Sequence, residues 1–165
     1  MKSLCAIGQS RRNLPIRGRA HKAARMTASL PERADAHAFS LDFTALPEHI
    51  DELGHVNNAV WVQWIQQVAT THWYAIAAPQ YRDAYIWVVI RHEIDYLRAA
   101  LEGDQVTART WVGEAPKGAR FDRFVEFTGS DGKVRVKART TWAMLDKATG
   151  RPQRIAPEIV APFIG

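Results

Sequence analysis

The stretch His49-Ile50-Asp51-Glu52-Leu53-Gly54-His55-Val56-Asn57-Asn58 lies between two segments with different hydrophobic periods. Before it, apolar and polar residues alternate over residues 39–46, which predicts a half-buried β-strand. After it, apolar residues recur at helical spacing over residues 59–77, which predicts a helix that stops before Pro79. The stretch is therefore a polar loop between a strand and a helix, and Asn57 or Asn58 is suited to cap that helix.

The predicted helix has one strongly apolar face and almost no charge on the other. The apolar positions are Val60, Trp61, Trp64, Ile65, Val68 and His72, while Gln63, Gln66, Gln67 and Thr70 fall mostly on the opposite side. A helix with so little charge is expected to be covered on most sides, and a sheet wrapped around it would do this.

Four more strand-like segments follow the helix. Residues 86–97 alternate in one register, with Ile86, Val88, Ile90, His92, Ile94 and Tyr96 on one face. Further strands are expected over residues 106–112, 121–127 and 134–144, with a hairpin signal at residues 129–132 and an irregular end from residue 149. This order predicts an α+β fold, in which one long helix packs against a curled five-stranded antiparallel sheet.

Residues 1–25 carry much of the positive charge of the chain. They hold seven Lys and Arg residues and no acid, so the rest of the chain has 15 basic against 17 acidic residues, a net charge of −2. We expect residues 1–30 to be a basic, disordered extension, or an overlong start with translation beginning at Met26, and residues 31–165 to be the folded domain. A mitochondrial-type transit segment and a basic arm for nucleic acid or anionic membrane are the alternatives for the tail.

The composition excludes several function classes. The near-neutral charge of the chain beyond residue 25 argues against nucleic-acid binding, and no apolar run is long enough to span a membrane. Neither a nucleic acid nor a membrane is therefore expected as a partner. Cys5 is the only cysteine, which excludes a disulfide framework and is compatible with a reducing compartment; the cytoplasm is the expected location. No serine lies in Gly-x-Ser-x-Gly, and no metal-ligand, phosphate-loop or dinucleotide motif occurs, so neither a metal nor a cofactor is expected.

An enzyme built from this chain would therefore use carboxylate, histidine, asparagine and backbone amide groups, and the polar loop offers them together. The first amides of a helix are unpaired and lie at the positive end of its dipole, so they can polarise a carbonyl and stabilise an oxyanion. Asp51, seven residues before Asn58, can act as a nucleophile or as a general base on water, and Gly54 lets the backbone turn sharply.

Each of these features has an ordinary structural alternative. Asp and Asn before a helix are common caps, His55 can be a satisfied structural histidine, and the tryptophans can be core residues. The basic residues of the last strand form either a solvated face or a surface for the phosphates of a large anionic substrate; they are Lys133, Arg135, Lys137 and Arg139.

The block Asp51-x-x-Gly54-His55-Val56-Asn57-Asn58-Ala59-Val60-Trp61-x-x-Trp64 resembles the hotdog-fold acyl-CoA and acyl-ACP thioesterases, both the 4-hydroxybenzoyl-CoA thioesterase type and the plant acyl-ACP thioesterase-like branch. The segments 96–99, 103–104 and 149–152 also resemble the family, so the likeness covers about residues 37–163. It implies a hotdog fold, in which a five-stranded antiparallel sheet wraps one long central helix. It also implies a homodimer or homotetramer with sites at the subunit interface.

The resemblance further implies roles for single residues. Asp51 matches the catalytic carboxylate, and the backbone amide of Asn58 matches the group that polarises the thioester carbonyl. His55 and Asn57 match the His-Val-Asn part of the plant-like motif. The catalytic candidates are therefore Asp51, Asn58 and His55, and the substrate-binding candidates are Gly54, Asn57 and Trp61.

Two departures from the family pattern affect the expected function. Leu53 stands where plant-type enzymes carry an asparagine, which favours a mechanism led by Asp51, and Gln66 and Gln67 stand where many relatives carry glutamate. The expected activity is hydrolysis of an acyl-CoA or acyl-ACP, in fatty acid metabolism, to free acid and thiol. A non-catalytic acyl-CoA-binding or regulatory hotdog protein is the alternative, and the missing glutamate favours it.

Overall fold

The computed structural model of the protein describes residues 37–164. The expectations for the basic tail, the start at Met26 and Cys5 concern residues that lie outside this range. Within it, no helix is both long enough and apolar enough to cross a membrane.

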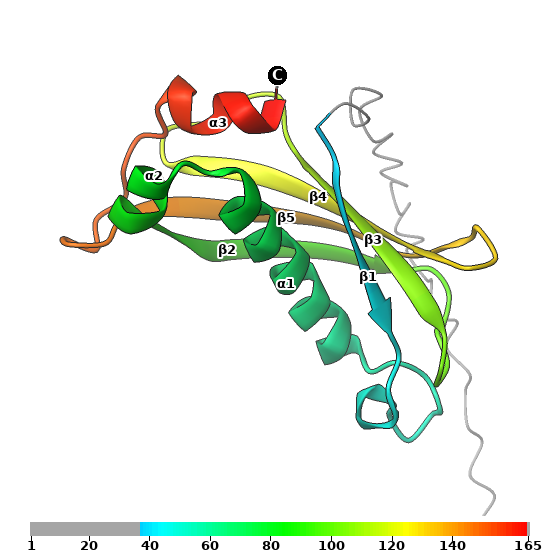
Figure 1. Cartoon of the computed structure of the whole chain (residues 1–165). Coiled ribbons are helices and arrows are strands. Elements are labelled where there is room, and N and C mark those ends of the chain that lie inside the picture. Colours follow the sequence, from blue (N-terminus) through cyan, green and yellow to red (C-terminus); the bar gives the residue numbers. More distant parts are fainter. Residues whose placement is uncertain (1–36, 165) are drawn as a thin grey trace, which may run out of the picture. The chain divides into compact units, whose positions relative to one another are not determined.

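Five antiparallel strands form one sheet, and its strand order is β1-β3-β4-β5-β2. The strands are β1 (Phe39–Thr44), β2 (Tyr85–Tyr96), β3 (Gln105–Val112), β4 (Arg120–Gly129) and β5 (Val134–Asp146). The sheet curves around the long helix α1 (Asn58–Ile76), as Figure 1 shows, so the predicted α+β fold is confirmed. Three short helices complete the domain: η2 (Pro47–His49), α2 (Pro79–Ala84) and α3 (Pro157–Ile164).

Helix α1 begins and ends where its sequence predicts. The side chain of Asn57 accepts a hydrogen bond from the N–H of Ala59 at 2.8 Å, which caps the first turn. Ala77 has an extended backbone and ends the helix ahead of Pro79, because the residues before a proline are disfavoured in helical conformation. All six predicted apolar positions of the helix are buried.

Aromatic side chains form the centre of the core between α1 and the sheet. Trp61 and Trp64 of α1 pack edge to face with ring centroids 5.0 Å apart. Phe43 of β1 stacks on Trp64 at 5.0 Å, and Phe127 of β4 meets Trp61 at 5.1 Å. Burial of such large apolar side chains is the main force that holds the helix in the curve of the sheet.

The opposite face of α1 is not covered, contrary to the expectation from its lack of charge. Gln63, Gln66, Gln67 and Tyr74 are exposed, with Tyr74 at 59%. The sheet wraps only the apolar face within residues 37–164, so a neutral, solvent-facing surface remains on the helix.

Strand β2 does not keep one register along its length. Its pairing with β5 shifts between Val89 and Arg91, and Ile90 is left out of the ladder. Because an extra residue reverses the faces of a strand, Trp87 packs inward before the bulge while Ile94 packs inward after it. The prediction that Ile86, Ile90 and Ile94 share one face is therefore wrong, and Ile86 and Ile90 are each 47% exposed.

The irregular end expected from residue 149 extends only to residue 156, and a helix follows it. Helix α3 buries Ile159, Val160 and Phe163. Ile159 and Val160 join a second apolar cluster around Met144 and Phe121, at the end of the sheet beside the C-terminal end of α1 (Figure 1). The domain therefore has two cores, of which only the first is evident from the central helix.

Candidate active site

Asp51 lies in a tight loop that its own side chain and backbone hold together. Its Oδ1 accepts hydrogen bonds from the N–H groups of Leu53 at 2.9 Å and His55 at 3.4 Å. Its own N–H donates to the carbonyl of His55 at 2.9 Å, and its carbonyl accepts from Gly54 at 3.0 Å. Within residues 37–164 the second carboxylate oxygen, Oδ2, accepts no hydrogen bond, so it is available to a substrate or a water molecule.

The base of this loop is bound to neighbouring elements. Ile50 and Val56 pair across it as an isolated bridge. The N–H of Val56 donates to the carbonyl of Ala100 at 2.8 Å, and the N–H of Asn57 donates to the carbonyl of His49 at 2.9 Å. The Asp51 carboxylate is thus held in a fixed position relative to the start of α1.

The first turn of α1 leaves one amide unpaired. The side-chain oxygen of Asn57 accepts a hydrogen bond from the N–H of Ala59, and the backbone carbonyl of Asn57 accepts one from the N–H of Val60 at 3.0 Å. The N–H of Asn58, the first residue of the helix, has no acceptor among the described residues. An unpaired amide at the positive end of a helix dipole can bind a carbonyl or an oxyanion.

The other candidates from the sequence lie in different surroundings. Gly54 has φ +78, and this left-handed conformation is what favours glycine, since the space around its Cα is open. The side chain of His55 is half-buried. Trp61 is 2% exposed and belongs to the core, and it does not line the cavity described below. Asn57 acts as the helix cap.

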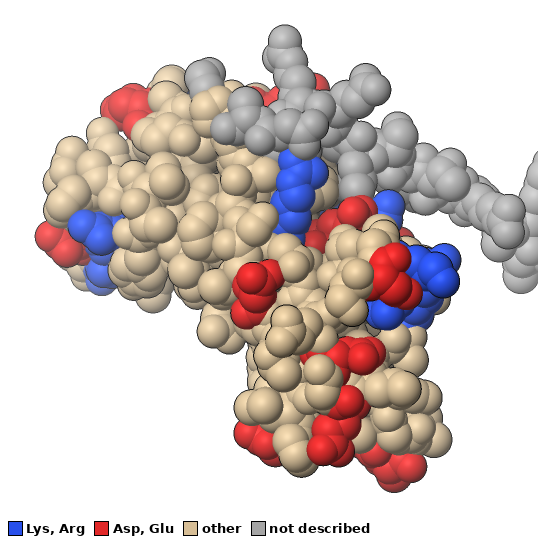
Figure 2. Space-filling view, turned by 45° about the vertical axis from the view of Figure 1, so that its right-hand side comes forward, with Lys and Arg blue, Asp and Glu red and all other residues tan. Residues whose placement is uncertain are grey.

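The end of the domain that carries Asp51 is acidic. Residues 37–81 contain no Lys or Arg, and this range includes Asp42, Glu48, Asp51 and Glu52. Figure 2 shows Asp and Glu side chains gathered at the lower end of the visible face, with no Lys or Arg among them.

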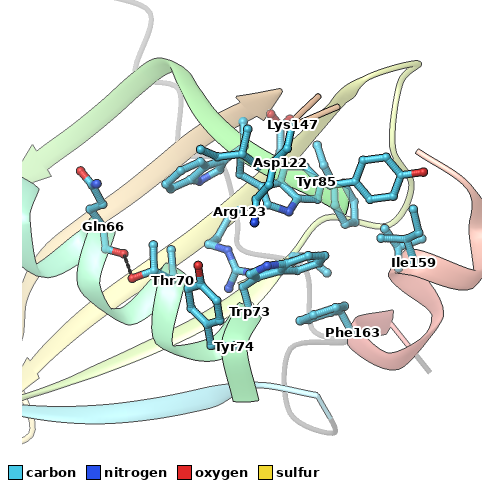
Figure 3. Close-up of a pocket in the computed structure, with 17 residues that line it drawn as sticks. Gln66, Thr70, Trp73, Tyr74, Tyr85, Asp122, Arg123, Lys147, Ile159 and Phe163 are labelled. Atoms are coloured by element: carbon cyan, nitrogen blue, oxygen red, sulfur yellow. Dashed lines mark hydrogen bonds between the residues drawn. The ribbon is translucent and has the colours of Figure 1, made fainter. Parts of the chain in front are cut away.

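A cavity of about 420 Å³ lies at the other end of α1. Its walls come from the C-terminal half of α1, the start of β2, strands β4 and β5, and α3 (Figure 3). The lining is mainly apolar, and its aromatic side chains include Trp73, Tyr85, Trp87 and Phe163. None of the residues of the Asp51 loop lines it, so one chain separates its catalytic candidates from its cavity.

The sequence gives little sign of this cavity. Helix α3, which supplies Phe163, was expected to be irregular, and the β2 bulge that directs Trp87 inward has no glycine or proline to mark it. Arg123, which also lines the cavity, is the one signal that could have been found, because it is a charged residue at an inward position of a predicted strand.

The basic residues of β5 are paired rather than open to a phosphate. Lys137 lies 3.1 Å from Glu126, and Arg139 lies 2.6 Å from Asp122. Arg135 similarly meets Asp131 at 3.2 Å. This face of the sheet is therefore a solvated set of ion pairs. Among residues 37–164, no group of three or more His, Cys, Asp or Glu side chains could hold a metal ion.

A single helix in the curve of an antiparallel sheet with the order β1-β3-β4-β5-β2, and a polar loop at the start of that helix, define the hotdog class of thioesterase folds. The chain belongs to the thioesterase-like superfamily, whose sequence model matches residues 45–163. The resemblance inferred from the Asp51 block is thus confirmed at the level of the family and the fold.

Plant acyl carrier protein thioesterases are similar to part of this chain in sequence. A palmitoyl-acyl carrier protein thioesterase from Gossypium hirsutum is 34% identical over 82 residues, which are 47% of this chain and 20% of that protein. A chloroplastic acyl-[acyl-carrier-protein] hydrolase from Cuphea viscosissima is 30% identical over 83 residues, 48% of this chain and 20% of that protein. The match thus spans about a fifth of the length of these plant relatives.

Solved structures share the fold over more of the chain. An acyl-ACP thioesterase from Bacteroides thetaiotaomicron superposes with a TM-score of 0.69 at 26% identity, covering 78% of this chain and 54% of that one. A thioesterase from Thermus thermophilus, solved in complex with coenzyme A and zinc, has a TM-score of 0.66 at 24% identity, covering 76% of this chain and 97% of that one.

Proposed function

We propose that the protein hydrolyses an acyl thioester of coenzyme A or acyl carrier protein, with Asp51 as the catalytic carboxylate. One observation carries the proposal, in a chain of the thioesterase-like superfamily. At the start of one helix lie an Asp51 oxygen and an Asn58 amide, neither of which has a hydrogen-bond partner among residues 37–164. The amide stabilises the negative charge that develops on the carbonyl oxygen during attack.

The reaction can begin in two ways. Either Asp51 removes a proton from water and the hydroxide adds to the carbonyl carbon, or the carboxylate itself adds and water later cleaves the anhydride. In both cases the C–S bond breaks, the thiolate leaves and takes up a proton, and the products are a free acid and a thiol. Leu53 offers no polar group to either route, so Asp51 leads the chemistry.

The neighbouring candidates have supporting roles in this proposal. Gly54 keeps the loop tight enough for the N–H groups of Leu53 and His55 to hold Asp51. Asn57 holds the first turn of α1 in place. His55 is half-buried beside the carboxylate loop and is the side chain best placed to contact the carrier or the leaving thiol. Trp61 supports the helix start from the core.

We further propose that two chains form the site by pairing along β2. This strand is a long sheet edge with exposed Ile86 and Ile90, and an unpaired apolar edge favours pairing with another strand. Within one chain α1 and β2 run in opposite directions: the Tyr96 hydroxyl meets the Asn58 carbonyl at 3.4 Å, and the Trp73 and Trp87 rings lie 5.5 Å apart.

This arrangement has a direct consequence for a two-fold homodimer. Antiparallel pairing of β2 with its copy places the Tyr96 end of one strand beside the Tyr85 end of the other. The Asp51 loop of one chain would then face the cavity of its partner. Arg82 and Lys147 lie at the cavity end, where the Lys147 ammonium donates to the Arg82 carbonyl at 2.6 Å, and they would offset the acidic loop and attract the phosphates of the carrier.

A binding protein without turnover is the second candidate. Gln66 lines the cavity from the exposed face of α1 and, with Gln67, replaces the carboxylate that many relatives carry there. If this replacement removed the activity, acyl-CoA would bind tightly and no free thiol would appear.

An acyl-CoA panel with free-thiol detection decides between the two. The wild type, Asp51→Ala and Asp51→Asn are compared, with Glu52→Ala as the matched control, because Glu52 is an exposed acid of the same loop. We expect both Asp51 variants to lose hydrolysis, while the wild type and Glu52→Ala keep it. Full hydrolysis by Asp51→Ala would refute the assignment, and tight binding without hydrolysis by the wild type would favour the binding role.

Subunit mixing tests the two-chain site. Asp51→Ala and a cavity-filling Thr70→Trp variant are each expected to be inactive, while a refolded mixture regains hydrolysis, because one hybrid site then holds an intact loop and an intact cavity. Sedimentation analysis of Ile90→Asp should show loss of the dimer. A wild type that is active as a monomer would contradict the pairing.

A further inference from the structure

The cavity contains a charge that its apolar lining does not explain. Arg123 lies on β4 with its side chain directed towards α1, as Figure 3 shows, and it is only 8% exposed. Its neighbours in the lining include Trp73 and Trp142. A buried guanidinium costs several kcal/mol of hydration free energy unless it is paired and hydrogen-bonded, so its partners must be accounted for.

The protein satisfies only part of this guanidinium. Nη1 of Arg123 lies 2.9 Å from Nδ1 of His72 and donates to the Thr110 hydroxyl at 3.1 Å, and that hydroxyl in turn donates to the Phe124 carbonyl at 2.9 Å. A guanidinium has five N–H donors. Within residues 37–164, Nη2 and Nε have no acceptor, which leaves three N–H donors without a protein partner.

The charge of Arg123 is also uncompensated by any of the residues that the structure describes. Burial lowers its pKa to about 10, so it remains a cation at neutral pH. Burial, and then the charge of Arg123, lower the pKa of His72 to about 3, so the imidazole is neutral and acts as an acceptor rather than a counter-ion. No Asp or Glu in the described part of the chain forms an ion pair with Arg123.

Asp122, the acidic residue next to Arg123 in the sequence, binds other residues. Asp122 accepts from Nη2 of Arg139 at 2.6 Å and from the Thr141 hydroxyl at 2.7 Å, on the outer face of the sheet. Two further buried donors belong to the cavity walls: the indole N–H groups of Trp87 and Trp142 have no acceptor among residues 37–164. Asp122 also lines the cavity, but both of its carboxylate oxygens are already bonded, so within residues 37–164 the cavity has an excess of donors and no free carboxylate to meet Arg123.

We propose that Arg123 binds a carboxylate at the far end of the acyl group, so that the substrates are thioesters of dicarboxylic acids rather than of plain fatty acids. The planar guanidinium fork matches a carboxylate, and the aromatic walls accommodate the methylene chain. The substrate class rests on the thioesterase function proposed above. His72 is fourteen residues after Asn58, about 21 Å along α1, so the Asp51 loop that serves this cavity is that of the partner in the proposed dimer.

The test compares substrates of equal chain length. Suberoyl-CoA and octanoyl-CoA differ only in the terminal carboxylate. The wild type is expected to hydrolyse suberoyl-CoA with a kcat/KM at least about ten-fold higher, since hydrogen bonds between charged groups are worth 1.5–3 kcal/mol. Arg123→Met should abolish this preference, so that the two thioesters are hydrolysed with similar kcat/KM. Arg120→Met is the matched control, because Arg120 is an exposed arginine of the same strand, and it should keep the preference.

Preference for octanoyl-CoA by the wild type, or an unchanged preference in Arg123→Met, would overturn the proposal. Calorimetry of free ligands with the wild type requires neither turnover nor a variant that folds. Octanoate, whose own carboxylate can reach Arg123, should bind at least about ten-fold more tightly than octanamide, whose head group is neutral. Equal binding would overturn the carboxylate site even if thioesters are hydrolysed. Tight octanoate binding without hydrolysis of any thioester would sustain the site and refute the hydrolase function.

Discussion

The buried imidazole of His72 makes a quantitative prediction about stability and pH. It is 3% exposed, stacks on Phe39 with centroids 5.1 Å apart, and meets Phe163 edge to face at 5.1 Å. Its only polar partner among the described residues is the Arg123 guanidinium, a cation. Protonation would therefore bring a second positive charge into an apolar site, and the pKa of His72 falls from 6.5 to about 3.

The sign and size of this pH effect follow from the linkage between proton binding and unfolding. The unfolded chain binds a proton at His72 below pH 6.5 and the folded chain does so only below about pH 3, so stability is complete above pH 6.5 and is lost as the pH falls. Between pH 7.5 and pH 5 this amounts to about 2 kcal/mol of unfolding free energy. The midpoint of thermal unfolding should then fall by about 6 °C.

Urea denaturation at pH 7.5, 6 and 5 measures this loss, with His72→Gln as the variant that keeps an acceptor for Arg123 but cannot titrate. His72→Gln should be less stable overall but nearly independent of pH over this range. His92→Gln is the control: burial also lowers the pKa of His92, in the same direction, but its side chain is less buried. A wild type with equal stability at pH 7.5 and pH 5, or an undiminished loss in His72→Gln, would refute the reasoning.

Three further predictions concern the helix start, the loop and α3. Asn57→Ala should cost about 1 kcal/mol in chemical denaturation by removing the cap, and Asn57→Ser should recover most of it. Gly54→Ala should cost about 1–2 kcal/mol of backbone strain at φ +78, and its thioester hydrolysis should fall by more than the loss of folded protein explains, because the loop holds Asp51. Phe163→Ala should cost about 3 kcal/mol in thermal unfolding, whereas Ile164→Ala, at an exposed position of the same helix, should cost less than about 1 kcal/mol. Equal costs at 163 and 164 would show that α3 does not pack as described.

Much of the fold could be predicted because its signals are local. The period of residues 59–77 and the capping asparagine define α1 to within a residue, and the hairpin at Gly129 to Gly132 closes as expected, with the Gly132 N–H bound to the Gly129 carbonyl at 2.9 Å. The Asp51 loop was predictable for the same reason. The hydrogen bonds of the Asp51 carboxylate join residues at most four positions apart.

The features that could not be predicted depend on distant residues. The bulge at Ile90 arises from the register of β2 against β5, and nothing in residues 86–97 marks it. Helix α3 contains Pro162 and follows an irregular segment, so its apolar pattern is too short to predict a helix. The helix is stabilised by its packing against β4 and β5. The neutral face of α1 indicated cover by the sheet, whereas the curve of one sheet reaches only one side of the helix.

The sequence by itself determined that residues 49–58 form a loop, which places the Asp51 carboxylate before a capped helix. The turn of the loop, the helix cap and the apolar period of the helix are all set by residues close together in the chain. Only the tertiary structure decided what surrounds it. It placed the cavity at the far end of α1 and directed Trp87 inward through a bulge. It also left Arg123 buried between His72 and Thr110, with no counter-ion in the part of the chain that the structure describes. Burial and charge pairing are sums over residues far apart in the chain, and no local pattern contains them.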